Sequence, residues 1–266
     1  MTVYYLGRGT NRSHIQPFPP GLRMLSGDQN ARTFDTQTLT SPTGGRPVAE
    51  RVSFACLDKA PQKETPHLAQ TSCENGLRAQ IHFQSCWDGV NLYKPDQSHV
   101  AYLSGIDNGE CPRSHPVPFV HLFYEVLYGV AQIHPAGGKY VFSQGDTTGF
   151  GFHGDFMNGW DAKVLTEAVA KCANTVDGDV GNCDVFKPTH VMDTEKICPP
   201  QKPLSNEPVR GFIENLPGNH TIGAVPAFVG KAASGSDGAA SVTAVYGGTS
   251  SSKTMASTTA ASMRRR

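Results

Sequence analysis

The chain has 266 residues, of which 38% are hydrophobic, and its 23 basic and 23 acidic side chains give a formal net charge of zero. This length suits one large domain or a domain with a tail, and the balanced charge excludes the basic surface that is typical of nucleic-acid-binding proteins. No stretch approaches the ~18 consecutive apolar residues of a membrane-spanning helix, so we expect neither a nucleic-acid partner nor a membrane span.

The N-terminal half of the chain contains short strand candidates separated by irregular stretches. Thr2–Leu6 has strand composition, whereas residues 7–50 are rich in Gly, Pro, Thr and Arg and are predicted to be mostly irregular because proline excludes regular helix. Val52–Leu57 and Leu77–Phe83 are further strand candidates. In the second of these the apolar residues alternate onto one face, the period of a half-buried strand. Another short strand is predicted at His99–Leu103.

The clearest strand is predicted at Phe119–Tyr128. Its even-numbered residues, from Val120 to Tyr128, are apolar or aromatic, whereas the odd-numbered ones include His121 and Glu125. This pattern is typical of a strand that is buried on one side and faces a neighbour or a groove on the other.

A short strand candidate at Tyr140–Ser143 leads into Gly145–Trp160, which is the most informative segment of the sequence. This segment, GDTTGFGFHGDFMNGW, holds five glycines. Each glycine costs ~1 kcal/mol in a helix relative to alanine, and glycines inside a strand weaken its pairing. We therefore predict a shaped loop that presents His153 and Asp155 among aromatic side chains, as many binding sites do.

One helix is predicted at Asp161–Ala173, because apolar residues recur there at helical spacing. Asn158 or Asp161 can cap its first turn. A weaker helix candidate covers Glu207–Leu216. Residues 221–266 are mostly Ala, Ser, Thr and Gly, which cannot bury enough apolar surface to offset the entropy lost on ordering, so this tail is predicted to be disordered.

Seven cysteines are spread along the chain, and none belongs to a CxxC pair. Their spacing argues against a zinc ribbon or a thioredoxin-type motif and is compatible with disulfides. These features favour a secreted protein over a cytosolic one with free thiols. The expected bridges are Cys86–Cys111, Cys56–Cys73 and Cys172–Cys183, and Cys198 remains.

Two further observations concern secretion. N-glycosylation sequons begin at Asn11 and Asn219, although such triplets also arise by chance. The first six residues lack the basic start and the apolar run of a signal peptide. Together with the odd number of cysteines, this absence leads us to expect that the chain lacks its true N-terminal part. The fold expected for residues 1–220 is a mainly β, extracellular domain, a sandwich or jelly-roll-like arrangement with one C-terminal helix, stapled by disulfides.

Several sequence segments occur in an order that resembles one known family. They are Phe83–Leu92 (FQSCWDGVNL), Ser98–Tyr102 (SHVAY), Cys111-Pro112, His115–Val117 and Gly145–Trp160. Together they resemble DUF1996, a family of secreted, mostly fungal domains of unknown function that often occur beside WSC carbohydrate-binding modules. The resemblance covers roughly residues 2–218 and implies an extracellular or cell-wall protein, with no particular reaction. It also implies an earlier segment with a Pro-His-x-His-like motif, which this chain does not contain.

The first functional hypothesis is a structural or binding module that interacts with cell-wall polysaccharide. Aromatic side chains offer large, rigid faces on which sugar rings can stack. The alternative is that these aromatic residues belong to the core. The binding candidates are Trp87, Tyr102, Phe152 and Asp146.

A rival hypothesis is a carbohydrate-active enzyme, either a glycoside hydrolase or a lyase. Glycosidic hydrolysis needs an acid and a base or nucleophile ~5–10 Å apart. Asp155 beside His153 is the first candidate, with Asp88 or Glu125 as the second carboxylate. The alternative for such carboxylates is a role in turns, for which Asp88-Gly89 is an ordinary dipeptide.

One short motif is set aside. Gln80-Ile81-His82 resembles a motif of jelly-roll polysaccharide lyases, but three residues are weak evidence and the family resemblance does not mark His82. His121 is given no role for the same reason.

The third hypothesis is a metal-dependent extracellular enzyme. Neutral imidazole is a good ligand for a divalent transition metal, and His99, His115 and His153 all lie within or beside the segments that carry the resemblance. Their spacings match no short metal-binding signature. The alternative is that each histidine forms a local hydrogen bond that fixes a loop.

Overall fold

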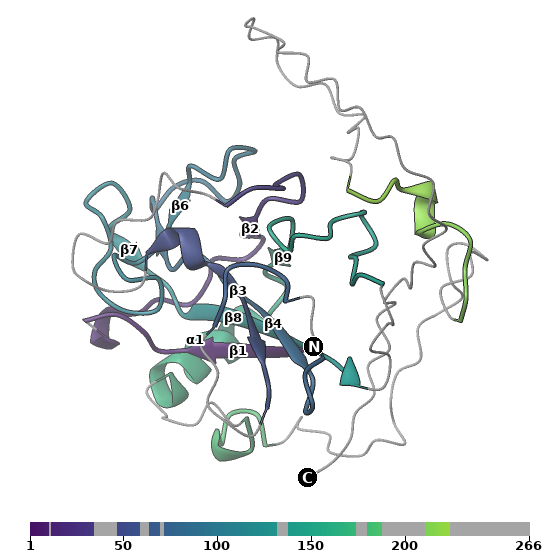
Figure 1. Cartoon of the computed structure of the whole chain (residues 1–266). Helices are drawn as coiled ribbons and strands as arrows, with labels where there is room; N and C mark the ends of the chain where they lie inside the picture. Colours follow the sequence, from purple (N-terminus) through teal and green to yellow (C-terminus); the bar gives the residue numbers. More distant parts are fainter. Residues whose placement is uncertain are drawn as a thin grey trace, which may run out of the picture.

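Nine β-strands and one α-helix form within the described residues of the computed structural model (Figure 1). The described residues are 1–10, 12–34, 47–58, 64–69, 72–131, 138–173, 180–187 and 211–223. The strands belong to one four-stranded sheet, one two-stranded ribbon and one three-stranded sheet. The chain is therefore mainly β with one helix, as the sequence predicts.

The four-stranded sheet has the order β1-β8-β4-β3, and all neighbouring strands are antiparallel. Its strands are β1 (Thr2–Leu6), β8 (His121–Tyr128), β4 (Leu77–His82) and β3 (Val52–Cys56). All four were predicted, with ends that differ by at most two residues. Period-2 alternation indicated β4 and β8, and strand composition indicated β1 and β3.

One face of this sheet forms the core of the domain. Leu77, Ala79 and Ile81 of β4 are at most 1% exposed, and so are Leu122 of β8 and Phe54 of β3. Burying a large apolar side chain contributes roughly 1.5–3 kcal/mol, so this face supplies much of the stability. The even-numbered face of the predicted strand at Phe119–Tyr128 is the one that faces the core.

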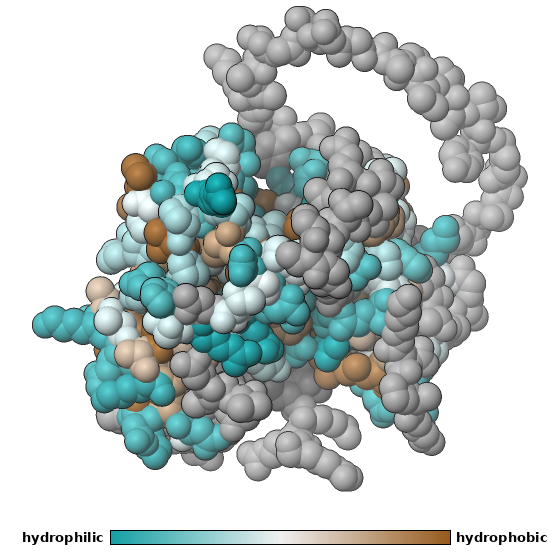
Figure 2. Space-filling model, turned by 90° about the vertical axis from the view of Figure 1, so that its left-hand side faces the viewer, coloured by the Kyte–Doolittle hydropathy of each residue, from teal (hydrophilic) through white to brown (hydrophobic). Residues whose placement is uncertain are grey.

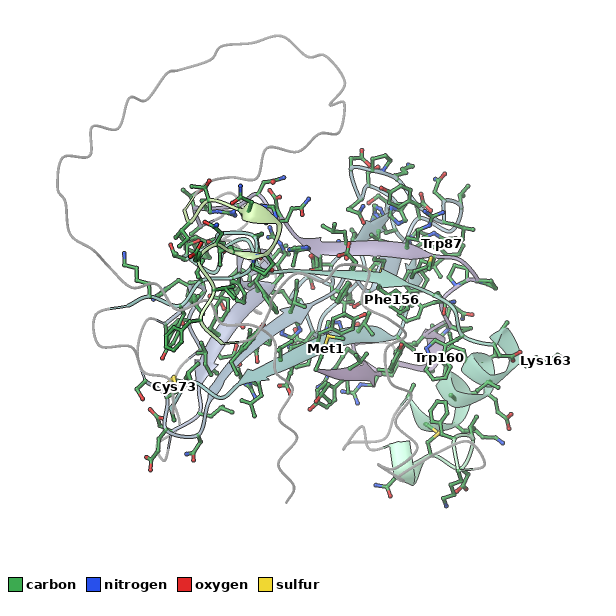
Figure 3. All side chains as sticks on the ribbon, turned by 90° about the vertical axis from the view of Figure 1, so that its right-hand side faces the viewer. Met1, Cys73, Trp87, Phe156, Trp160 and Lys163 are labelled. Carbon is green, nitrogen blue, oxygen red and sulfur yellow. A yellow bond between two sulfur atoms is a disulfide. The ribbon has the colours of Figure 1, made fainter. Side chains whose placement is uncertain are left out.

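A two-stranded ribbon lies across this apolar face as a second layer (Figure 3). β2 (Arg23–Gly27) pairs antiparallel with β9 (His153–Met157). Gly154 faces the sheet, and a Cβ at this position would lie 2.8 Å from the ring of Phe83. Only glycine permits this approach, so the glycine that seemed to weaken a strand here is what allows the two layers to pack.

A third, smaller sheet stands beside the other two. β5 (Cys86–Trp87) pairs with β6 (Val100–Ala101) on one side and with β7 (Val117–Pro118) on the other. The Cys86–Cys111 disulfide joins β5 to the loop before β7.

The helix α1 (Ala162–Cys172) begins where the sequence predicts it. The Asp161 carboxylate accepts hydrogen bonds from the N–H groups of Lys163 and Val164, at 2.9 and 3.0 Å. Leu165 and Ala168 face the core. None of the helices in the described part of the chain has both the length and the apolar character needed to cross a membrane. Short 3-10 helices lie at Arg12–His14, Val48–Glu50, Val180–Asn182 and Pro217–Asn219.

All three expected disulfides are present, with Cα–Cα distances of 5.2, 5.6 and 5.7 Å for Cys56–Cys73, Cys86–Cys111 and Cys172–Cys183. Cys198 lies outside the described residues. On the face shown in Figure 2, apolar side chains form small separate groups among polar ones.

Three predictions about secondary structure need correction. The segment Gly145–Trp160 contains β9, and the stretch 7–50 contains its partner β2, because pairing between distant segments overrides their weak local preference. Tyr140–Ser143 is not a strand but enters a turn in which the Gly145 N–H bonds to the Phe142 carbonyl. Residues 211–216 are not helical, and the rest of that candidate helix lies outside the described residues. So does the predicted tail after Gly223.

Candidate functional site

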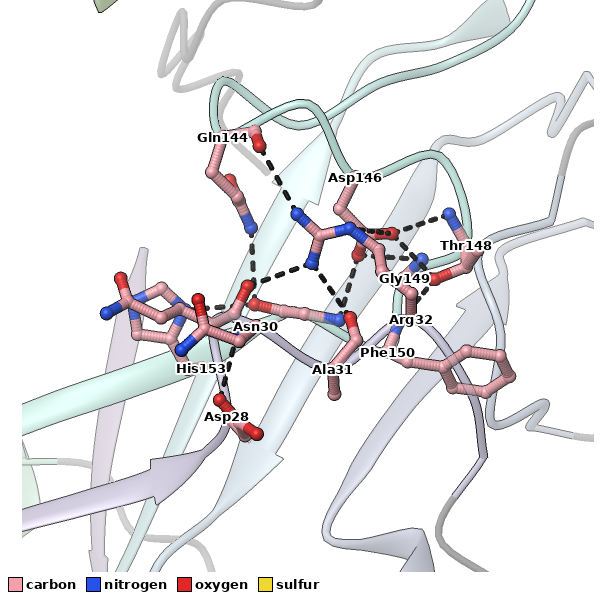
Figure 4. Close-up of polar contacts among 12 residues, drawn as sticks. Asp28, Asn30, Ala31, Arg32, Gln144, Asp146, Thr148, Gly149, Phe150 and His153 are labelled. Carbon is pink, nitrogen blue, oxygen red and sulfur yellow. Dashed lines mark hydrogen bonds and ion pairs between the residues drawn. The ribbon is translucent and has the colours of Figure 1, made fainter. Parts of the chain in front are cut away.

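Asp146 organises the loop that precedes β9 (Figure 4). Its side chain is fully buried. One carboxylate oxygen accepts bonds from the N–H and the hydroxyl of Thr148, and the other from the N–H groups of Gly149 and Gly151, all at 2.6–3.0 Å. Both oxygens are thus occupied by the loop itself. Asp146, predicted as a binding residue, is turned into the loop and away from solvent.

Arg32 fixes this loop to the turn that follows β2. Its guanidinium lies 3.9 Å from Asp146 and donates to the carbonyls of Ala31 (2.8 Å) and Gln144 (3.3 Å). Gly149 completes the loop at a φ of +89°, and a Cβ there would lie 2.6 Å from the Leu68 nitrogen. The glycines of this segment are therefore required by a close approach and a left-handed backbone.

His153 and Asp155 point from the same face of β9, as alternate residues of a strand do. The His153 Nδ1 lies 2.9 Å from the Gly151 carbonyl oxygen, which fixes it as the protonated nitrogen. The other ring nitrogen, Nε2, lies 3.9 Å from the Asp155 carboxylate. The Asp155 side chain is 73% exposed. The predicted pair is therefore brought together, and its carboxylate is open to a ligand.

A cavity of about 280 Å³ opens at the end of β9, between β1 and the start of α1. It is lined by Tyr5, Phe156, Met157, Gly159, Trp160 and Asp161. Phe156 and Trp160 lie near one another at the side of the molecule where α1 begins (Figure 3). Met157 is 70% exposed and forms the rim.

The aromatic residues that line the cavity hold one another in position through direct contacts. The Trp160 indole N–H donates to the Tyr5 hydroxyl at 2.9 Å, and the two rings meet edge to face with centroids 5.6 Å apart. The ring of Phe186 also contacts the Trp160 ring, with centroids 5.6 Å apart. The walls are therefore positioned before any ligand arrives.

Tyr124 lies beside Tyr5, because the register pairs Val3 with Tyr124 and Tyr5 with Leu122 on the core face of the sheet. Burial, the neighbouring Tyr5 and the negative charge of Asp155 raise the pKa of Tyr124 to about 12. Burial likewise raises the pKa of Tyr5. Both phenols are protonated at neutral pH, and the hydroxyl of Tyr124 has no hydrogen-bond partner among the described residues. Tyr124 is thus the diagonal neighbour of the lining residue Tyr5, and Asp155 lies on the same face of β9 as the lining residue Met157.

Glu125 lies on the opposite face of the sheet, because it follows Tyr124 in the strand. Its carboxylate accepts a bond from the Tyr4 hydroxyl at 2.9 Å and pairs with Arg78 at 3.2 Å. Since the sheet separates Glu125 from Asp155, it cannot act with that residue on one substrate.

Asp88 and Trp87 hold the turn after β5. The Asp88 carboxylate accepts the N–H groups of Val90 and Asn91 and the Asn91 side-chain amide, at 2.7–2.9 Å. The Trp87 indole N–H donates to the Asn91 carbonyl at 2.7 Å, and its ring stacks on Phe119 with centroids 5.8 Å apart. Among the four carboxylate and histidine candidates, His153 and Asp155 are the pair that the structure brings into contact.

The hydrogen bonds of Asp88 lead to a prediction about pH. Burial alone would raise its pKa, but the bonds from Asn91 and Val90, with Lys94 nearby, outweigh it and lower the pKa from 3.8 to about 2. Because the pKa is lower in the folded state, the ionised group stabilises the fold above pH 3.8, and this contribution is lost as the pH falls through about 2. We expect Asp88→Asn to lower the free energy of unfolding by about 1–2 kcal/mol at pH 7.

Urea unfolding of both proteins between pH 7 and pH 2 checks this expectation. The difference should stay constant down to about pH 4 and then shrink as wild-type Asp88 is protonated. A difference that persists unchanged at pH 2 would show that ionisation of Asp88 plays no part.

Tyr102 and Phe152, two of the predicted binding residues, pack within the domain. The Tyr102 hydroxyl lies 2.8 Å from the Ser26 hydroxyl, and burial raises the pKa of Tyr102. The Phe152 ring contacts those of Phe54 and Phe142, with centroids 5.9 and 5.4 Å away. Core packing was the alternative stated for such aromatics.

The three predicted metal ligands each bind a backbone carbonyl instead. A ring nitrogen of His99 lies 2.7 Å from the Arg23 oxygen, one of His115 lies 3.1 Å from the Ser98 oxygen, and His153 contacts Gly151. His99 contacts Arg23, and His153 pairs with Gly27. These two residues are at opposite ends of β2, roughly 13 Å apart, so His99 and His153 are held at separate places. Within the described residues, which include all three histidines, no group of three or more His, Cys, Asp or Glu side chains could hold a metal ion.

His82 and His121, which were set aside, form a buried hydrogen-bonded chain. The His82 Nδ1 lies 3.0 Å from the His121 Nε2, and the His121 Nδ1 lies 2.7 Å from the Ser85 hydroxyl. Burial, together with the nearby His82 and Arg8, holds the pKa of His121 well below its usual value. This hydrogen-bonded group is closed to solvent, since His82 is only 6% exposed and Ser85 only 1%. We therefore assign these side chains to the packing of the core.

Sequence reasoning missed Tyr5, Tyr124, Met157 and Asp161 as site residues. One signal was available, because a tyrosine on the apolar face of a strand must direct its hydroxyl to a partner or to water. Tyr124 has this position in the strand predicted at Phe119–Tyr128. The convergence of these residues on Trp160 requires the tertiary structure.

Comparison with known proteins gives one match. A family model described as "Domain of unknown function (DUF1996)" matches residues 1–160. The matched part contains all nine strands and every residue that lines the cavity except Asp161. No curated protein and no solved structure matches the chain.

Proposed function

The chain belongs to the DUF1996 family, and on that basis we propose that it is a secreted module that binds extracellular polysaccharide, such as that of a cell wall, in the cavity beside β9. Three disulfides support the extracellular location, because such bonds persist in oxidising compartments. The observation that carries the binding proposal is the cavity itself, with its aromatic walls, the Tyr124 hydroxyl beside Tyr5, and the Asp155 carboxylate on the same face of β9 as Met157.

These groups suit the chemistry of sugars. A sugar ring has apolar C–H faces, which pack on aromatic side chains such as Tyr5 and Trp160. Its hydroxyls need donors and acceptors, and the Tyr124 hydroxyl and the Asp155 carboxylate are free to serve. At about 280 Å³ the cavity is near the lower end of the ~300–1,000 Å³ usual for ligand sites. It therefore suits a single ring of a longer chain.

Binding to a panel of soluble and insoluble polysaccharides tests this proposal. Tyr124→Phe removes the hydroxyl and keeps the ring, so we expect it to weaken binding about fivefold, the value of one hydrogen bond. Tyr128→Phe is the matched control, because Tyr128 lies on the same strand and face but beyond the residues of β8 that pair with β1, the strand whose Tyr5 lines the cavity. Its affinity should stay within about twofold of wild type.

Two outcomes would contradict the proposal. One is that the full chain binds no member of the panel. The other is that Tyr124→Phe and Tyr128→Phe weaken binding equally, which would separate binding from this cavity.

A second candidate function, glycoside cleavage, has one observation in its favour, the His153–Asp155 pair at 3.9 Å. Asp155 lies beside the cavity, and a neighbouring histidine can position or protonate such a carboxylate. Release of soluble sugars from a bound polysaccharide, measured for wild type and Asp155→Asn, distinguishes this function from binding alone. Release that survives the substitution would remove Asp155 from any catalytic role.

A further inference from the structure

We propose that the cavity selects a cationic amino sugar, that is, a hexosamine whose amine is free and not acetylated. This inference rests on the proposed function, that the cavity binds carbohydrate, and it names the class of sugar. The ammonium group would lie against the aromatic walls, with the Asp155 carboxylate as its counter-ion.

Three aromatic residues line the cavity. Tyr5, Phe156 and Trp160 border one space of about 280 Å³. The electron-rich faces of such rings attract cations, and Trp and Tyr are stronger than Phe in this respect. Because Trp160 is already hydrogen-bonded to Tyr5, the rings need little rearrangement to accept a cation.

The charges around the cavity are also of the kind that favours a cation. Asp161 is among the lining residues, and none of the lining residues is basic. Asp155 is 73% exposed, and its 3.9 Å contact with His153 is its one polar contact within the described residues. Asp155 lies on the same face of β9 as Met157, a lining residue two positions along the strand.

Arg23, the one arginine or lysine of the ribbon, is directed elsewhere. Arg23 pairs with Met157 in the register of β2 and β9. Its guanidinium, however, lies over the ring of Tyr93, 5.3 Å from the centroid. It therefore interacts with the loop after β5, and the carboxylate of Asp155 remains available.

The same charges discriminate against other sugars. A uronic acid would bring its carboxylate close to Asp155 and Asp161, and like charges at a binding site oppose association. A neutral or N-acetylated sugar could stack on the rings, but it would lose the attraction of a cation for them. Selectivity for the free amine follows from both effects.

The test compares three oligosaccharides of equal length, made of glucosamine, N-acetylglucosamine or glucose, by calorimetric titration of the full chain at pH 7. We expect the glucosamine oligomer to bind about tenfold more tightly than the other two. In Asp155→Asn this preference should fall about fivefold, while affinity for the glucose oligomer changes less than twofold. Glu167→Gln is the matched control, because it removes one exposed negative charge from α1, where Glu167 pairs with Lys171 and does not line the cavity.

The outcomes separate this inference from the function on which it rests. Equal affinity for the three oligomers would overturn amine selectivity and leave carbohydrate binding intact. An equal loss of preference in Asp155→Asn and Glu167→Gln would show a general charge effect and also overturn it. If no oligomer and no polysaccharide binds, the proposed function itself fails.

Discussion

Replacing Asp146 by asparagine is expected to lower the free energy of unfolding by about 3–5 kcal/mol, the range seen when one partner of a buried ionic contact is removed. The carboxylate is fully buried beside Arg32 and accepts four hydrogen bonds at 2.6–3.0 Å. An amide in its place would turn an NH₂ group toward N–H donors and remove the negative charge beside Arg32. Urea denaturation followed by circular dichroism measures the change.

Asp155→Asn is the control for this experiment. It makes the same chemical change nine residues along the chain, but at a side chain that is 73% exposed. Its effect on stability should stay within about 0.5 kcal/mol, as for most surface substitutions. If the two variants lose similar stability, the hydrogen bonds around Asp146 do not stabilise the loop.

Removing the Cys86–Cys111 bridge is the second large expected effect. The bridge joins residues that are 25 positions apart. By lowering the entropy of the unfolded chain over that length, it should raise the free energy of unfolding by about 3.5 kcal/mol. The double variant Cys86→Ala/Cys111→Ala should therefore unfold at a markedly lower urea concentration. Because Cys86 is completely buried in the central strand of the small third sheet, the loss should not be recovered by repacking at the surface.

The Cys172–Cys183 bridge supplies the comparison. It closes only 11 residues, for which the same relation gives about 2.8 kcal/mol. The matching double alanine variant should thus be the more stable of the two. A larger loss at Cys172–Cys183 than at Cys86–Cys111 would contradict the chain-entropy explanation for this protein.

Local patterns were sufficient for much of the fold. Leu77–His82 and His121–Tyr128 alternate apolar and polar residues, and such a period identifies both the strand and the face that is buried. Asp161 precedes a helical pattern and caps it, which also depends only on neighbouring residues. The cysteine spacings were compatible with the three bridges, although spacing alone does not fix connectivity.

The ribbon of β2 and β9 could not be predicted in the same way. Arg23–Gly27 lies in a stretch with many prolines and glycines, and His153–Met157 contains Gly154. Neither segment has a strong strand preference of its own. Their pairing depends on an approach to Phe83 across the core, which is a long-range contact.

The sequence by itself determined the mainly β class, the single capped helix, the disulfides and the family, because these depend on local periods, spacings and ordered motifs. It also marked His153 and Asp155 as neighbours on one segment. Only the tertiary structure decided that Tyr5, Phe156 and Trp160 meet at one cavity, that Glu125 lies behind the sheet, and that three histidines bind carbonyls. Such convergence joins residues more than a hundred positions apart, and strand register and layer packing, not local preference, bring them together.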